Sequence, residues 1–193
     1  MSTATVPIRS KAVLKRFRNY YKDERPNIRN YCIIAFGLNS ALRISDMLNL
    51  RWEDIYNFHR HRFKDHLQLT ESKTHKLKTL RINSNSKEAL HKLFILNRPQ
   101  PSDYVFTKTT DHTKPLSRSQ AYRIVTTAAH ALSISECVSC HSLRKTFGYQ
   151  AWKQGVPPEL LMDIFNHSSY EVTKRYLGIT QDEKDDIYQK IEL

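Results

Sequence analysis

The chain has 193 residues, which is enough for one domain with a hydrophobic core. Its 31 lysine and arginine residues outnumber its 19 aspartate and glutamate residues, so the formal net charge is +12 at pH 7. Such a surplus favours a polyanionic partner, DNA or RNA first, because binding releases the counterions condensed on phosphates. No apolar run approaches the ~18 residues of a membrane span, and no segment is a strong amphipathic membrane anchor.

Composition disfavours several further classes of protein. The N-terminal residues lack the apolar core of a secretory signal, so we expect a cytosolic chain. Three cysteines do not predict a disulfide framework there. The C-x-x-C-H pattern of residues 137–141 is weak evidence for haem or zinc, because nothing directs export and zinc needs four ligands. Nucleotide-binding glycine motifs are absent. We therefore expect no metal, nucleotide or redox cofactor.

Apolar periodicity in the first half of the chain predicts helices followed by strands. We expect helices over residues 8–24, about 26–40 and around 43–48. Pro26 fits the first position of the second helix. We expect three short strands over residues 52–58, 66–70 and 78–82, with a polar turn over residues 71–76.

The second half predicts helices only. We expect them around residues 90–96 and over 117–132, 142–153, 157–165, 169–177 and the acidic tail 181–190. Pro99 and Pro101 end the first, Ser117 or Ser119 caps the second, and Gly155 ends the third. The predicted fold class is α+β, mainly α: a helical bundle with a small three-stranded antiparallel sheet.

Three polar patterns stand out within these elements. His141 and Arg144 lie three residues apart, so a helix places them on one face, where they could grip a phosphate from two directions. His167 precedes Tyr176 by nine residues. Arg43 sits among small and apolar residues, and a buried arginine needs an anionic partner, which Asp46 could supply. Taken singly, the first pattern is more typical of an exposed polar face and Tyr176 of a core aromatic, whereas an arginine in the surroundings of Arg43 is unusual.

Taken together, the patterns resemble the catalytic domain of the tyrosine recombinases, the family of phage-type integrases and Xer-type resolvases. Residues 42–46 resemble its first-arginine box, residues 141–144 its H-x-x-R box and residues 166–169 its L-G-H-S box. Tyr176 stands where the family's nucleophile stands. The interval of 23 residues from Arg144 to His167 also matches. Two departures replace the family's usual glycines with Ala41 and Asn166; asparagine tolerates the left-handed backbone region, so its turn is expected to survive.

The resemblance implies that Tyr176 attacks a DNA phosphodiester, joins the 3′ phosphate covalently and frees a 5′ hydroxyl. Further roles follow from it. The residues expected to clamp the phosphate, move protons or support the site are Arg43, Lys73, His141, Arg144, His167 and Asp46. Lys73 is the expected general acid, with Lys76 as its competitor in the same turn.

The resemblance also implies double-stranded DNA as partner and self-association, as a tetramer on paired sites and a monomer when free. Basic residues outside the site are candidates for holding the DNA backbone, namely Lys11, Lys15, Arg16, Arg18, Lys76 and Arg118. The outcome could be integration, excision or inversion. Two rival functions remain open: a type IB topoisomerase-like enzyme, and a DNA-binding regulator that no longer cuts.

The expected organisation is a catalytic domain over residues 1–180 and a tail over residues 181–193. The tail docks on a neighbouring subunit, packs on its own domain or is disordered. The family's N-terminal DNA-embracing domain is absent from this sequence, so the chain is either a single-domain recombinase or part of a longer protein. A bacterial or phage origin, with association to the nucleoid, is the expected setting.

Overall fold

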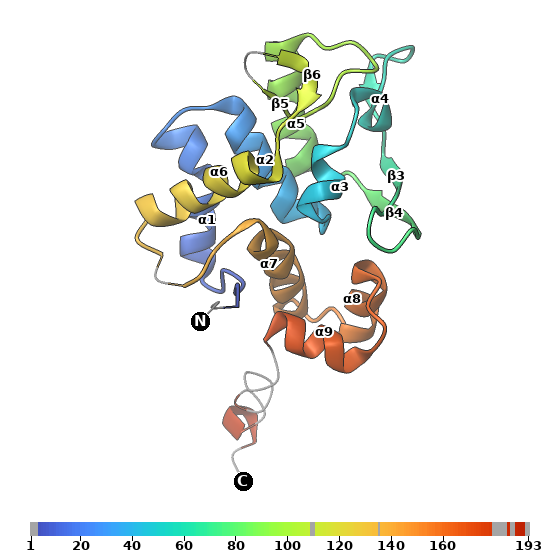
Figure 1. Cartoon of the computed structure of the whole chain (residues 1–193). Helices are drawn as coiled ribbons and strands as arrows, with labels where there is room; N and C mark the ends of the chain where they lie inside the picture. Colours follow the sequence, from blue (N-terminus) through green and yellow to red (C-terminus); the bar gives the residue numbers. More distant parts are fainter. Residues whose placement is uncertain (1–3, 109–110, 135, 179–184, 186–187, 192–193) are drawn as a thin grey trace.

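The computed structural model describes residues 4–108, 111–134, 136–178, 185 and 188–191. It confirms the expected α+β, mainly helical fold (Figure 1). The helices are α1 (Lys11–Asp23), α2 (Ile28–Ser40), α3 (Ile44–Leu48), α4 (Trp52–Ile55), α5 (Ser84–Asn97), α6 (Arg118–Ala131), α7 (Cys140–Lys153), α8 (Pro158–Phe165) and α9 (Tyr170–Leu177). The strands are β1 (Tyr56–Asn57), β2 (Arg62–Phe63), β3 (His66–Thr70), β4 (Leu77–Arg81), β5 (Thr107–Lys108) and β6 (Asp111–Pro115).

Helix α2 forms the centre of the main core. Every residue from Tyr31 to Leu38 is buried, and α1, α5 and α7 pack against it. A helix that is apolar on all sides is typical of the interior of a domain. The expected start at Pro26 is wrong. The helix begins at Ile28, because the side chain of Asn27 caps it by accepting a hydrogen bond from the backbone N–H of Asn30.

The other predicted helices form close to their expected positions. Ser117 caps α6, as one of the two expected alternatives, by accepting a hydrogen bond from the backbone N–H of Gln120. Helix α5 ends at Asn97, before Pro99. Helix α7 begins at Cys140, two residues before the expected start, so the whole H-x-x-R pattern lies in its first turns.

The strands differ more from expectation. Among the described residues they form three antiparallel pairs, β1–β2, β3–β4 and β5–β6, instead of one three-stranded sheet. The β3–β4 hairpin was expected, and it pairs His66 with Arg81. The first expected strand is partly wrong, because residues 52–55 form helix α4. The carboxylate of Asp54 accepts a hydrogen bond of 2.7 Å from the backbone N–H of Arg51, which closes this helical turn.

Helices α7, α8 and α9 share a second, smaller core at one end of the molecule (Figure 1). Phe165 from α8 and Leu177 from α9 are fully buried in it, and Tyr176 packs against it. Gly148 of α7 permits this packing, since a Cβ atom there would lie only 2.6 Å from atoms of both Phe165 and Leu177. The helices that bear the H-x-x-R, histidine and tyrosine motifs are therefore packed as one unit.

No helix in the described ranges is long and apolar enough to cross a membrane. The expected tail helix over residues 181–190 falls largely outside the described residues. Within the described part of the tail, residues 188–190 are helical, and Tyr188 and Ile191 are exposed. The docking of this tail therefore stays a prediction.

Candidate active site

Two sharp backbone turns bring the motifs together. Ala41 ends α2 with a φ of 52°, which places Arg43 at the N-cap of α3. Asn166 ends α8 with the same φ of 52°, directly before His167. Both residues occupy the left-handed region that glycine adopts without strain. The survival of the turn at Asn166 is confirmed, and Ala41 adopts the same conformation.

Arg144 of α7 is almost fully buried and forms hydrogen bonds to the backbone at both turns. Its Nη2 donates a hydrogen bond of 2.8 Å to the carbonyl oxygen of Phe165, and its Nη1 donates to the carbonyl oxygen of Ala41. These two carbonyl groups immediately flank the segments that carry Arg43 and His167. Arg144 thus fixes the spacing between two other candidate residues, and it also lines the groove described below.

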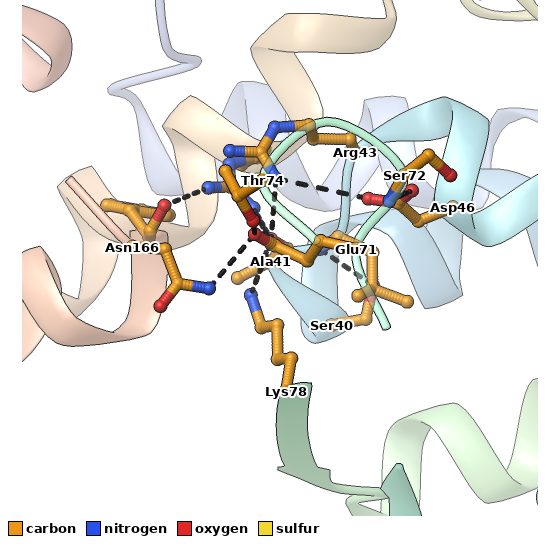
Figure 2. Close-up of polar contacts among 12 residues, drawn as sticks. Ser40, Ala41, Arg43, Asp46, Glu71, Ser72, Thr74, Lys78 and Asn166 are labelled. Carbon is orange, nitrogen blue, oxygen red and sulfur yellow. Dashed lines mark hydrogen bonds and ion pairs between the residues drawn. The ribbon is translucent and has the colours of Figure 1, made fainter. Parts of the chain in front are cut away.

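Glu71 lies at the centre of the polar cluster drawn in Figure 2, and sequence reasoning missed it. Its carboxylate is fully buried, with Oε1 2.8 Å from Nη1 of Arg43. Its Oε2 accepts hydrogen bonds from the hydroxyl of Thr74 at 2.7 Å and from the amide of Asn166 at 2.9 Å. Burial alone would raise the pKa of this carboxyl group, but Arg43, Thr74 and Asn166 outweigh burial and lower the pKa to about 2.

Asp46 lies beside Arg43, and its hydrogen bond goes to the backbone of the neighbouring turn. Its Oδ1 accepts a hydrogen bond of 3.0 Å from the backbone N–H of Ser72, and its Oδ2 lies 4.0 Å from Nη1 of Arg43. Asp46 therefore ties helix α3 to the turn that carries Lys73.

Lys78 of β4 is a second residue that the sequence did not single out. Its Nζ donates a hydrogen bond of 2.7 Å to the carbonyl oxygen of Ile164 and lies 3.9 Å from Oε1 of Glu71. Burial, followed by the positive charge of Arg144, lowers the pKa of Lys78 to about 8.

Tyr176 lies between the two candidate histidines. Its ring centroid is 5.0 Å from that of His141 and 4.9 Å from that of His167, and both ring pairs are T-shaped. Its hydroxyl oxygen is buried and has no hydrogen-bond partner among the described residues. Burial raises the pKa of Tyr176 to about 12, against the opposing charge of Arg144. A buried polar atom without a partner marks a place where a ligand could complete the site.

The two histidines are neutral at pH 7. Desolvation lowers the pKa of each imidazole to about 4, assisted at His141 by the charge of Lys145 and at His167 by that of Arg144. Nδ1 of His167 lies 2.9 Å from the hydroxyl of Thr173, which is fully buried and orients the ring. Lys145 was likewise not expected here; its Nζ lies 5.2 Å from the centroid of the Tyr176 ring.

An open groove of about 1160 Å³ leads to these residues. Its wall includes Arg43, Lys73, His141 and Arg144, so four of the six expected catalytic residues share it. Tyr176 and His167 are not among its lining residues. Lys76 is exposed but does not line the groove either, so the geometry favours Lys73 as the residue that reaches the site.

The expected DNA-contacting residues separate into two places. Arg118 lines the groove of Arg43 and His141 together with Tyr122 and Arg123, which sequence reasoning did not name. The α1 residues lie elsewhere: Lys11, Lys15 and Arg18 line a different groove of about 630 Å³, and Arg16 lies 3.9 Å from Glu24.

The known proteins that resemble this chain in sequence include integrases and recombinases. A family model described as the phage integrase family matches residues 8–183. The chain is 40% identical over 176 residues to the probable integrase/recombinase YoeC of Bacillus subtilis (strain 168), covering 91% of each chain. It is 27% identical over 165 residues to a tyrosine recombinase of Pseudothermotoga lettingae, covering 86% of this chain and 54% of that protein. The chain therefore spans about half the length of this longer relative.

Solved structures share the fold. The crystal structure of XerA recombinase matches with a TM-score of 0.76 at 18% identity, covering 97% of this chain and 66% of that one. A lambda integrase dimer bound to a COC′ core site matches with a TM-score of 0.69 at 18% identity, covering 92% of this chain and 49% of that one. At these identities, the likeness shows the architecture alone.

Proposed function

The chain belongs to the phage integrase family as a tyrosine recombinase, and from that premise we propose that it cuts and rejoins DNA through a covalent bond to Tyr176. The observation that carries this proposal is the position of the Tyr176 hydroxyl. It is buried without a hydrogen-bond partner among the described residues, between two neutral imidazoles and beside the charge of Arg144.

The cluster around Glu71 and Asp46 has a net positive charge, which favours the binding of an anion. Three cations, Arg43, Lys78 and Arg144, lie within 4.0 Å of a carboxylate of this pair. Three positive charges against two negative charges leave one positive charge, which a phosphodiester would neutralise. Nη1 of Arg43 faces Glu71, and Arg43 also lines the groove, so the rest of its guanidinium can donate to a non-bridging phosphate oxygen.

The proposed cleavage step transfers two protons, one from the nucleophile to a base and one from an acid to the leaving oxygen. The phenolic oxygen of Tyr176 attacks the phosphorus, and neutral His141 accepts the phenolic proton. The bond to the 5′ oxygen breaks, and Lys73 supplies the proton that this leaving oxygen needs. Attack of a 5′ hydroxyl on the phosphotyrosine then rejoins the strand. Because the covalent bond conserves the energy of the phosphodiester, the cycle needs no nucleotide cofactor.

His167 is proposed to hold the phosphate during this step. A neutral imidazole has one donor nitrogen, and Thr173 decides which one it is. The Thr173 hydroxyl lies 2.9 Å from Nδ1 and 3.5 Å from the carbonyl oxygen of Ser169. When it donates to the nearer Nδ1, the proton of His167 resides on Nε2, where it can bind a phosphate oxygen.

Double-stranded DNA is the proposed partner, held along the groove by Arg118 and Arg123. Recombination exchanges strands between paired sites, so we propose that copies of the chain assemble as a tetramer on DNA. The choice among integration, excision and inversion then depends on how two target sites are arranged.

Covalent trapping tests the proposal. Wild-type protein is incubated with fragmented DNA from around its own gene, denatured with SDS, and any attached DNA is sequenced. Adducts clustered at one repeated sequence and bearing free 5′ hydroxyls support a site-specific recombinase. Scattered adducts favour a topoisomerase-like enzyme, and tight binding without adducts favours a DNA-binding regulator. Comparing Lys73→Met with Lys76→Met identifies the general acid, because only the loss of that residue slows cleavage strongly.

A further inference from the structure

We propose that Glu71 is a positioning residue for DNA cleavage, whose buried carboxylate fixes Arg43 relative to the turns that carry Lys73 and His167. This inference rests on the proposed recombinase function. It assigns a role to a residue outside the recognised motifs.

Glu71 connects three segments that are distant in the sequence (Figure 2). Its Oε1 lies 2.8 Å from Nη1 of Arg43, at the start of α3. Its Oε2 accepts a hydrogen bond from Thr74, which neighbours Lys73 in the β3–β4 turn. The same oxygen accepts one from Asn166, which lies 95 residues away and precedes His167. One carboxylate thus contacts Arg43 itself, the residue next to Lys73 and the residue next to His167.

The contacts require a charged carboxylate and not merely a polar group. All three partners are donors, and Glu71 is fully buried, so no water replaces a missing acceptor. Glutamine has the same shape, but its amide NH₂ would face either Arg43 or the Thr74 and Asn166 donors. The resulting repulsion would shift Arg43. Catalysis is sensitive to such shifts, since a displacement of about 1 Å can cost about 10²-fold in rate.

The test uses a double-mutant cycle in single-turnover cleavage. Rates of covalent adduct formation at saturating DNA are measured for wild type, Glu71→Gln, Arg43→Ala and the double variant, together with DNA Kd. We expect Glu71→Gln to slow cleavage by about 10²-fold with Kd changed less than about threefold. In the Arg43→Ala background we expect less than about a threefold further loss, because Glu71 acts through Arg43.

Glu88→Gln is the matched control. It removes the charge of an exposed glutamate that pairs with Lys92 on α5, outside the site, and it should cleave at the wild-type rate. If Glu71→Gln does not fold, Thr74→Val carries the test. It removes one hydrogen bond to the same carboxylate and leaves Glu71 charged and paired with Arg43, so it should slow cleavage by a smaller factor.

Equal losses from Glu71→Gln in both backgrounds would overturn the positioning role, as would cleavage within about twofold of wild type. Unchanged cleavage by Thr74→Val would overturn it if Glu71→Gln does not fold. These results leave wild-type adducts intact and so leave the proposed function standing. Absence of adducts from wild-type protein would instead remove both proposals.

Discussion

At the scale of single residues, the orientation of His167 depends on one buried hydroxyl. The Thr173 side chain lies 2.9 Å from Nδ1 and is fully buried, so no water can take its place. Thr173→Val keeps the shape of the side chain and removes the hydrogen bond. We predict that this variant cleaves DNA about 10-fold more slowly or worse, with DNA affinity retained, because Nδ1 loses the partner that orients the phosphate-binding ring of His167. Thr173→Ser is the control and should cleave at nearly the wild-type rate. Equal rates for Thr173→Val and wild type would contradict the prediction.

The two histidines make stability depend on pH. Their folded pKa of about 4 lies below the unfolded value of about 6.5. Below pH 6.5 the unfolded chain gains protons that the folded protein does not bind, so their contribution to stability falls as pH drops from about 6.5 to about 4. We predict that His167→Gln loses less stability than wild type between pH 7 and pH 5. Urea unfolding at both pH values measures this, and identical losses in the two proteins would reject it.

Some of the site could be predicted from local sequence, and some could not. Arg43, His141, Arg144, His167 and Tyr176 belong to short motifs, and the structure gathers them within one cluster. Lys73 is placed in the groove wall as expected, although its chemical role stays a prediction.

The residues that sequence reasoning missed are defined by distant partners. Glu71 contacts Arg43 and Asn166, and Lys78 donates to the carbonyl oxygen of Ile164. Nothing near Glu71 or Lys78 in the sequence distinguishes them from exposed charged residues, because their burial results from packing between segments.

At the scale of elements, α7 lies so close to α8 and α9 that the packing of these helices is sensitive to added side-chain volume. A Cβ atom on Gly148 would lie 2.6 Å from atoms of Phe165 and Leu177. We predict that Gly148→Ala destabilises the protein by about 1–3 kcal/mol through overpacking. It should also slow cleavage, because the Phe165 carbonyl binds Arg144 and Leu177 follows Tyr176 in α9.

Urea unfolding and single-turnover cleavage measure these effects. Gln154→Ala, at the exposed C-cap of the same helix, is the control and should change both quantities little. Wild-type stability in Gly148→Ala would mean that the helices separate freely, contrary to this account.

The length of an element decides whether it could be predicted from the sequence. The longer helices show several turns of apolar periodicity and begin or end at recognisable caps, so they form where expected. Residues 52–55 form a helix where we expected a strand, because four residues show too little periodicity to distinguish a helical turn from a strand. Their conformation is decided by the carboxylate of Asp54 and by a hydrogen bond from the backbone N–H of Trp52 to Asp103.

At the scale of the whole molecule, the charge surplus of +12 must be distributed so that DNA meets the groove. Arg118 and Arg123 are exposed and line it with the catalytic residues. We predict that replacing both with glutamine weakens DNA binding and reduces the slope of log K against log salt by about 2, since each neutralises about one phosphate. Lys87→Gln is the control, because Lys87 pairs with Asp65 and does not line the groove. An unchanged slope in the double variant would place the DNA elsewhere.

The central claim is that Tyr176 forms the covalent bond to DNA, and mapping that bond tests it most directly. Wild-type adducts are trapped with SDS, digested with nuclease and trypsin, and analysed by mass spectrometry. Trypsin separates Tyr176 from the nearby Tyr170, because Lys174 and Arg175 lie between them. We predict nucleotide on the peptide that begins at Tyr176, and no adduct from Tyr176→Phe despite retained DNA binding. Nucleotide on the Tyr170 peptide, or adducts that persist in Tyr176→Phe, would contradict it.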